Sequence, residues 1–361
     1  MTAFLALIAT ATAADLNGSR VFYNGAISGY NFRIPAIVQA EDKTLVAFAE
    51  ARHGGDSSVD HIAFSRSTDS GMTWSNVTFA AGATDSPAVR KACAADITAC
   101  RVGNPAAVYD AFKKRIIVIF AIRGFQGGED AIGMGMVTSS DSGMTFSKII
   151  DLSVTFGAAN ASMPGPGTAL QLRGSGKHAG RLLLVSHHGA YQRDYVTYSD
   201  DHGTSWKTIN QTFPHMDEAA LTQLPNGSVL LNMRHTSSPK TGRAIALSRD
   251  DGQTFTNISY DSTLESPVCQ ASIVSFDGAT YFSNPASTHG RNHLTIRKSV
   301  DNAATWSGGS LLVQEGNSAG YSCLVRGMLP PKKGEPGPVG GILYEDTKGG
   351  ISFARFPLAM K

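Results

Sequence analysis

The sequence has little net charge and no long apolar run. Its 31 lysines and arginines stand against 29 aspartates and glutamates, so the formal net charge is only +2. Because that balance creates no broad basic field, the composition argues against general binding of nucleic acid or anionic membranes. The N-terminal apolar stretch, residues 4–13, is too short to span a bilayer. An anionic ligand would therefore have to be held by arginines gathered locally.

Cysteines are few, and motifs for metal or phosphate chemistry are missing. The spacing of the four cysteines does not resemble a zinc site. Cys93 and Cys100 are close enough to bridge one loop, whereas Cys269 and Cys323 form either a second pair or two buried thiols. There is no Walker-type loop and no helical His-Glu-x-x-His. The pair His187-His188 would point to opposite faces of a strand, so we expect no metal and no cofactor.

A repeated octet, approximately Ser-x-Asp-x-Gly-x-Thr-aromatic, is the main feature that the chain does have. Its five copies begin at Ser67, Ser139, Ser199, Ser248 and Ser299, at intervals of 72, 60, 49 and 51 residues. A period in this range is typical of the blades of a β-propeller. Blades of about 50 to 60 residues predict six in this chain, the sixth without a recognisable octet.

Each octet has the chemistry of a tight turn. The aspartate accepts hydrogen bonds from nearby backbone N–H groups, and the glycine adopts a backbone angle closed to other residues. The aromatic residue then packs at the start of the next strand. We interpret the octets as structural. In the fifth copy Ala303 replaces the glycine, so that turn has a different backbone shape or is strained.

Short β-rich runs recur between the octets, and none has a helical period over twelve residues. The runs are residues 43–51, 115–123, 181–186, 228–233 and 340–344. We predict an all-β fold, a six-bladed β-propeller that forms one domain over residues 15–361. The proline-rich segment at 330–338 is typical of a surface loop between strands and is too short to separate domains.

Two features favour a secretory route. Residues 1–14 resemble the remnant of a signal peptide, with an apolar stretch and a small-residue end but no basic start. Six Asn-x-Ser/Thr sequons occur where chance would give roughly two or three; they lie at Asn17, Asn76, Asn160, Asn210, Asn226 and Asn257. We expect an extracellular location or a lysosome-like lumen.

The motif Phe32-Arg33-Ile34-Pro35, just before the first predicted blade strands, resembles the sialidase (neuraminidase) family when it is taken with the octets. Segments 45–52, 163–168, 282–285 and 320–322 are similar to further landmarks of that family. The combination most resembles lysosomal-type sialidases and their bacterial relatives. This resemblance implies a sialidase propeller that acts on sialylated glycoproteins, glycolipids or oligosaccharides.

The resemblance also implies an arginine clamp. Sialic acid carries a carboxylate on its anomeric carbon, and planar, permanently charged arginines suit that group better than lysine. The family uses three arginines, and the matching positions here are Arg33, Arg234 and Arg291. Arg297 is a nearby competitor for Arg291, and regular strand alternation would not separate the two.

By the same resemblance Tyr321 is the nucleophile and Glu218 its base, with Asp217 the neighbour most easily confused with Glu218. A carboxylate nucleophile would approach the substrate's own carboxylate, and the two like charges would repel. A neutral phenol avoids this repulsion. Because a free phenol has a pKa near about 10, we expect Glu218 and the arginines to make its ionisation easier.

The resemblance also implies an acid/base aspartate in the glycine-flanked loop before the first octet. Asp56 stands eleven residues before Ser67 and takes the family position, with Asp60 as the alternative. A group on such a loop suits protonation of the leaving oxygen and later activation of water. Arg52 either contacts a sugar hydroxyl or pairs with Glu50 or a neighbouring acid.

Together these residues predict a retaining exo-α-sialidase. Two alternatives keep the scaffold and the mechanism, namely transfer of sialic acid to another glycan and hydrolysis of a deaminated sialic acid. A third is a non-catalytic propeller that binds glycans or proteins. Against this third reading, a pure scaffold has no reason to keep the clamp, nucleophile, base and acid together.

Overall fold

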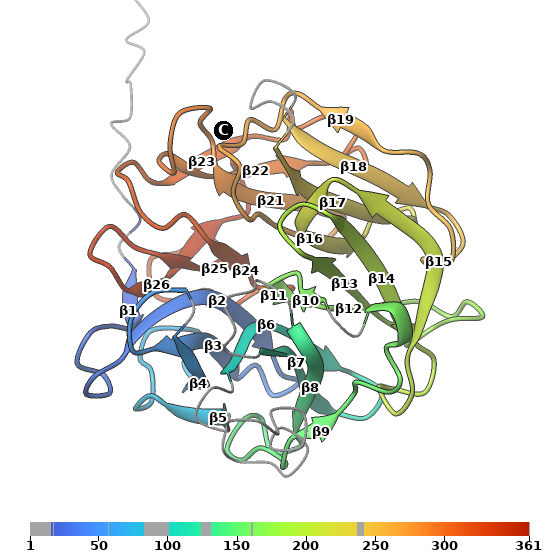
Figure 1. Ribbon diagram of the computed structural model, residues 1–361. Helices are drawn as coiled ribbons and strands as arrows, with labels where there is room; N and C mark the ends of the chain where they lie inside the picture. Colours follow the sequence, from blue (N-terminus) through green and yellow to red (C-terminus); the bar gives the residue numbers. More distant parts are fainter. Residues whose placement is uncertain are drawn as a thin grey trace, which may run out of the picture.

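In the computed structural model, six β-sheets are arranged around a central axis (Figure 1). The structure describes residues 16, 18–56, 58–82, 101–123, 131–159, 162–236 and 242–360. Within these residues every element is a β-strand except one 3-10 turn, Gly157–Ala159. The predicted all-β, six-bladed propeller is therefore confirmed.

The blades follow one another along the chain. Blade one contains β2 (Asn31–Gln39), β3 (Leu45–Arg52), β4 (Val59–Ser67) and β5 (Thr78–Gly82). Blade two contains β6 (Arg101–Asp110), β7 (Arg115–Arg123), β8 (Ala131–Ser139) and β9 (Ile150–Asp151), with β11 (Gly167–Thr168) parallel to β6. Blade three contains β10 (Met163–Pro164), β12 (Leu170–Gln171), β13 (Leu182–His188), β14 (Arg193–Ser199) and β15 (Lys207–Pro214).

The remaining blades have four strands each. Blade four contains β16 (Met216–Gln223), β17 (Val229–His235), β18 (Arg243–Ser248) and β19 (Ser259–Asp261). Blade five contains β20 (Ser272–Phe276), β21 (Ala279–Pro285), β22 (Leu294–Ser299) and β23 (Ser310–Gln314). Blade six contains β24 (Ser322–Leu324), β25 (Val339–Glu345), β26 (Ile351–Pro357) and β1 (Ser19–Phe22).

The core lies between neighbouring blades. The five β-rich runs predicted from sequence are the second strands of their blades, β3, β7, β13, β17 and β25. Second strands are covered on both faces by adjacent blades, so most of their residues are apolar. Val46 and Phe48 of β3, for example, pack in one cluster with Val118 and Phe120 of β7, and all four side chains are fully buried. The proline-rich segment lies between β24 and β25, as predicted.

Every octet connects the third strand of a blade to the fourth. In the first copy Asp69 accepts hydrogen bonds from the Thr73 backbone at 2.9 Å and from the Ser67 hydroxyl at 2.7 Å. Gly71 has a φ of +87°, and a Cβ there would lie 2.0 Å from the Phe353 ring. This position therefore requires glycine for its backbone angle and for the close approach of blade six.

The fifth octet keeps the same turn without glycine. Ala303 has a φ of +61°, and its N–H donates to the Ser299 hydroxyl at 2.9 Å, as Gly71 donates to Ser67 at 2.8 Å. Of the two outcomes expected for this copy, the structure shows backbone strain rather than a different turn.

The missing sixth octet has a topological cause. The third strand of blade six is β26, near the end of the chain, whereas the fourth is β1, near its beginning. No covalent turn joins these two strands, so an octet has no place there. This pairing closes the propeller with strands from both ends of the chain.

Some sequence predictions fall outside the described residues, namely the signal-like segment 1–14, the cysteines Cys93 and Cys100, and the sequons at Asn17 and Asn160. Cys269 and Cys323 are buried free thiols, which decides between the alternatives left open for them. In the described part of the chain no helix is long and apolar enough to cross a membrane.

Candidate active site

Most of the residues predicted to carry chemistry meet around one tyrosine. They come from four blades and lie at or near the end where the first strand of each blade begins. They are Arg33 on β2, Arg52 at the end of β3, Asp56 between β3 and β4, Glu218 on β16, Arg234 on β17, Arg291 between β21 and β22, and Tyr321 directly before β24.

Tyr321, Glu218 and Arg234 form a hydrogen-bonded set. The Tyr321 hydroxyl donates to Glu218 Oε1 at 2.5 Å, and Arg234 Nη1 donates to Glu218 Oε2 at 2.5 Å and to the Tyr321 hydroxyl at 3.3 Å. Tyr321 is 7% exposed and Glu218 5%. The phenol proton is thus already directed at the carboxylate that would receive it.

The other two clamp arginines lie over the ring of the same tyrosine. The guanidinium carbons of Arg33 and Arg291 are 5.4 and 5.5 Å from the centroid of the Tyr321 ring. Arg291 is fixed by a 2.8 Å hydrogen bond from Nη1 to the carbonyl of Ala319. All three predicted clamp residues therefore contact Tyr321, Arg234 at the phenol oxygen and Arg33 and Arg291 over the ring.

The structure separates Arg291 from its competitor Arg297. Arg291 lies in the loop before β22 and not on a strand, so strand alternation does not apply to it. Arg297 lies within β22 and donates to Asn284 Oδ1 at 3.0 Å on the neighbouring strand. Only Arg291 of the two contacts Tyr321 in the described structure.

The Phe-Arg-Ile-Pro motif forms a bulge that positions Arg33. The register between β2 and β3 shifts between Arg33 and Ala36, and Ile34 has a φ of +60°, an unfavourable value for a β-branched residue. The Ile34 N–H donates to Glu345 Oε1 at 3.0 Å. Strained backbone of this kind persists only where its surroundings hold it, and it is concentrated at functional sites.

Glu345 is a candidate site residue that the sequence did not reveal. It ends β25, is 2% exposed, accepts from Arg33 Nε at 2.5 Å and accepts from the Tyr321 backbone N–H at 3.0 Å. One carboxylate thus orients a clamp arginine and the backbone of the candidate nucleophile. Burial opposes the charge of Arg33, but Glu345 outweighs it and raises the pKa of Arg33 above its ordinary value. The only signal in the sequence was a carboxylate at the end of an apolar strand.

Asp56, in the loop between β3 and β4, lies close to Arg33 and Arg52. The Asp56 side chain is 84% exposed, pairs with Arg52 and lies 3.9 Å from Arg33 Nη1. Arg52 also donates to Glu50, whose other oxygen accepts from a backbone N–H at 2.6 Å. Arg52 therefore makes the ion pair expected as one of its two alternatives, and it also contacts Asp56. Asp60 is the second residue of β4 and lies where the register between β3 and β4 shifts.

The expectation that Glu218 and the arginines make ionisation of Tyr321 easier is wrong. Burial and then the negative charge of Glu218 raise the pKa of Tyr321 well above its ordinary value, although Arg234 acts in the opposite direction. Ionisation is therefore harder than in water, not easier. The phenol is neutral and hydrogen-bonded, so its proton has to move to Glu218 during attack.

Asp217, the residue before Glu218, contacts both the Glu218 backbone and His187. Asp217 Oδ1 accepts from the Glu218 N–H at 2.6 Å and lies 3.1 Å from His187 Nδ1. Asp217 thus holds the strand and histidine, while Glu218 alone of the pair bonds to Tyr321. Among the described residues no group of three His, Cys, Asp or Glu side chains is arranged to hold a metal ion.

The arrangement suits displacement at a carbon that carries a carboxylate. Three cations would bind the anion, a neutral phenol would attack, a paired carboxylate would take the phenol proton, and an exposed carboxyl on a loop would serve the leaving group.

Comparison with known proteins shows which family the chain resembles in sequence and fold. Residues 87–328, more than half of the chain, match the model of the BNR repeat-like domain. The chain is 31% identical to a sialidase of Micromonospora viridifaciens over 93% of its length, and 30% identical to a sialidase of Bacteroides fragilis over 93%. It spans 53% and 64% of those two relatives.

A solved structure gives the same result. The Hadza microbial sialidase Hz136 superposes with a TM-score of 0.78 at 27% identity, over 94% of this chain and 68% of that one. The repeated octets and the six-bladed fold fit this likeness. The chain belongs to the sialidase family.

Proposed function

We propose that the protein is a retaining exo-α-sialidase that releases terminal sialic acids from glycoconjugates. One observation carries the proposal: the Tyr321 hydroxyl donates to Glu218 at 2.5 Å beneath three converging arginines. This geometry serves a substrate whose reacting carbon bears a carboxylate. The similarity to named sialidases over 93% of the chain supports it.

In the first step Arg33, Arg234 and Arg291 hold the substrate carboxylate. The Tyr321 oxygen bonds to the anomeric carbon while its proton passes to Glu218. The bond from that carbon to the glycosidic oxygen breaks, and Asp56 protonates the departing oxygen. Since the pKa of Tyr321 is raised by burial and by Glu218, attack and proton transfer are coupled.

In the second step Asp56, now a carboxylate, takes a proton from water, and the water oxygen bonds to the anomeric carbon. The bond to Tyr321 breaks and Glu218 returns the proton to the phenol oxygen. Two displacements at one carbon retain its configuration. The arginines also stabilise the flattened, positively charged transition state by fixing the carboxylate.

The substrates would be sialylated glycoproteins, glycolipids or oligosaccharides, and residues 15–361 would form the single catalytic domain. A secretory, extracellular or lysosome-like location follows from the sequons and the signal-like start. The four sequon asparagines within the described residues, at positions 76, 210, 226 and 257, are all exposed, as glycosylation requires.

The test is turnover of a fluorogenic sialoside by the wild type, Tyr321→Phe and Tyr260→Phe. We expect Tyr321→Phe to lose at least about 10³-fold in kcat/KM, while Tyr260→Phe, a 47% exposed tyrosine on β19, keeps full activity. Near-normal turnover by Tyr321→Phe would overturn the assignment.

Product analysis by NMR separates this proposal from the alternatives. Hydrolysis with retention gives the α-anomer of free sialic acid first, whereas transfer gives a new glycoside or an internal anhydro sugar. Parallel assays with deaminated and asialo substrates define the sugar specificity. Binding of sialosides without any turnover would favour the non-catalytic propeller.

A further inference from the structure

Two hollows lie at the end of the inner strands that is opposite to Tyr321. One has a volume of about 240 Å³ and is lined by the ends of β2 and β6 and by residues 168–174. The other, about 310 Å³, is lined by the turns after β16 and β20. Arg173, Gly174 and Arg326 line both, so the hollows meet at these residues. We call the first of them, with its two arginines, the axial arginine pocket.

This pocket is distant from the candidate active site. On β2, Arg33 lies near the beginning of the strand and Gln39 ends it. Six residues of extended strand span roughly 20 Å. Gln39 lines the pocket, whereas Arg33 lies over Tyr321. A ligand in the pocket would therefore contact none of the clamp residues.

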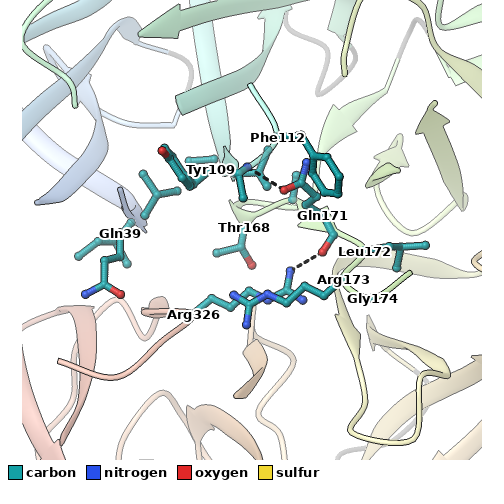
Figure 2. Close-up of a pocket in the computed structure, with 15 residues that line it drawn as sticks. Gln39, Tyr109, Phe112, Thr168, Gln171, Leu172, Arg173, Gly174 and Arg326 are labelled. Carbon is teal, nitrogen blue, oxygen red and sulfur yellow. Dashed lines mark hydrogen bonds between the residues drawn. The ribbon is translucent and has the colours of Figure 1, made fainter. Parts of the chain in front are cut away.

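Arg173 and Arg326 are the only charged residues among those that line the two hollows. Figure 2 shows them on one wall of the pocket, with Thr168 beside them and Tyr109 and Phe112 across from them. No aspartate or glutamate is part of the described lining. The wall thus presents two positive charges and several neutral polar groups over an apolar base.

Arg326 does not use all of its hydrogen-bond donors within the protein. Its Nη1 donates to the carbonyl of Gln171 at 3.0 Å, but its buried Nε has no hydrogen-bond partner. Burial, and then the charge of Arg173, lower the pKa of Arg326 to about 9. In the described structure neither arginine is ion-paired with a carboxylate. Uncompensated cations of this kind are costly unless an anion joins them.

We propose that the axial arginine pocket binds a small oxyanion, namely phosphate or sulfate, free or as the monoester of a small molecule. Two guanidinium groups attract the negative charge of such an ion and offer planar, paired donors to its oxygens. The unpartnered Nε of Arg326 supplies one of these donors. The apolar remainder of the wall, which includes Val38, Val108 and Leu172, leaves room for the carbon skeleton of an ester.

Isothermal titration calorimetry of the full chain in a chloride buffer tests this. The probes are sodium phosphate, sodium sulfate, glucose 6-phosphate and galactose 6-sulfate, each against sodium chloride of equal ionic strength. We expect a Kd below about 10 mM for at least one probe. An ester that binds at least tenfold more tightly than its inorganic ion identifies an organic ligand, and equal binding identifies the free ion; both outcomes support the pocket.

Variants test whether the heat of binding measured by calorimetry comes from the axial arginine pocket. We expect Arg326→Gln to weaken binding by about tenfold or more and Arg173→Gln by about threefold, whereas Arg33→Gln, which disables the clamp, leaves it unchanged. Turnover of the fluorogenic sialoside should be normal in both pocket variants. If Arg326→Gln fails to fold, the loss of binding in Arg173→Gln, at the exposed mouth of the pocket, is the deciding measurement. Absence of binding by every probe overturns the proposal, as does binding lost only in Arg33→Gln.

Discussion

The arginines at the two ends of the propeller differ in whether a carboxylate pairs with them. Around Tyr321, Arg33 is paired with Glu345 and Arg234 with Glu218, and in both cases the pKa of the arginine is raised even though burial acts to lower it. At the opposite end Arg326 has no carboxylate partner, and its pKa is lowered to about 9 by burial and by Arg173. Paired arginines are thus held in place before a substrate arrives, whereas an unpaired arginine is a charge that a ligand would stabilise.

The largest effect should come from removing the base at the paired end. Glu218→Gln keeps the shape of the side chain but cannot accept the phenol proton from Tyr321. We expect kcat/KM for a sialoside to fall by about 10²- to 10⁴-fold. The matched control is Glu335→Gln, which disrupts a remote ion pair with Arg355 at 2.6 Å. A fall of similar size in the control would contradict a role specific to Glu218.

The next effect should come from Glu345, which touches no substrate in the proposed mechanism. Glu345→Gln removes the charge that orients Arg33 and weakens the acceptor for the Tyr321 backbone. We expect kcat/KM to fall by about 10- to 100-fold and the free energy of unfolding by about 1–3 kcal/mol. Activity and urea unfolding measured together separate the two contributions.

A purely structural role for Glu345 predicts a different pattern. In that case stability would fall while kcat/KM, measured well below the unfolding transition, stayed normal. Glu345→Asp, which keeps the charge on a shorter side chain, should recover part of the activity. If it recovers none, positioning of Arg33 by charge is not the explanation.

Much of the fold could be predicted because the octets mark one turn in each of five blades and the β-rich runs mark second strands covered on both faces. The residues proposed as clamp, base and nucleophile could be named from the sequence because each lies within a short motif of a family resemblance. Glu345 could not, since its partner Arg33 is 312 residues away and the contact exists only once blade six closes on blade one. The raised pKa of Tyr321 also depends on burial, which no local motif encodes.

A smaller effect is expected at the octets. Slight burial acts to raise the pKa of Asp141, but hydrogen bonds from Thr145 and Ser139 outweigh it and lower the pKa to about 2. Because the folded pKa lies below the unfolded value of about 3.9, this stabilisation is full above about pH 4 and is lost as the pH falls toward 2.

Asp141→Asn should therefore be less stable than the wild type by about 1 kcal/mol at pH 6. The difference should shrink as the pH falls from 4 to 2. Urea unfolding at pH 6, 4 and 2.5 measures it, with Asp277→Asn, in a turn without an octet, as control. A difference that stays constant with pH would show that the carboxylate charge is not what stabilises the turn.

The smallest effect should come from the unpaired end. Arg326→Met removes a half-buried cation but keeps an unbranched side chain, so we expect the unfolding free energy in chloride buffer at pH 7 to rise by about 0–1 kcal/mol. Since the folded pKa of Arg326 is about 9, below that of the unfolded chain, the wild type gains stability as the pH rises above 9. The variant lacks this gain, so its advantage should shrink between pH 7 and 10.

A loss above about 2 kcal/mol in Arg326→Met would contradict the contrast between the two ends. Such a loss would mean that Arg326 stabilises the fold through its hydrogen bond to the Gln171 carbonyl. It would argue against a charge that only a ligand stabilises. Arg326→Lys, which keeps a charge without the planar fork, separates charge from geometry in the same assay.

The account's central claim is that Tyr321 forms the covalent bond to the sugar. Mass spectrometry of the protein after incubation with a 2,3-difluoro sialic acid, followed by digestion and peptide sequencing, tests this most directly. The account predicts one sugar adduct per chain, located on Tyr321 and absent from Tyr321→Phe. An adduct on Glu218 or Asp56, or full inactivation of the wild type with Tyr321 unmodified, would contradict it.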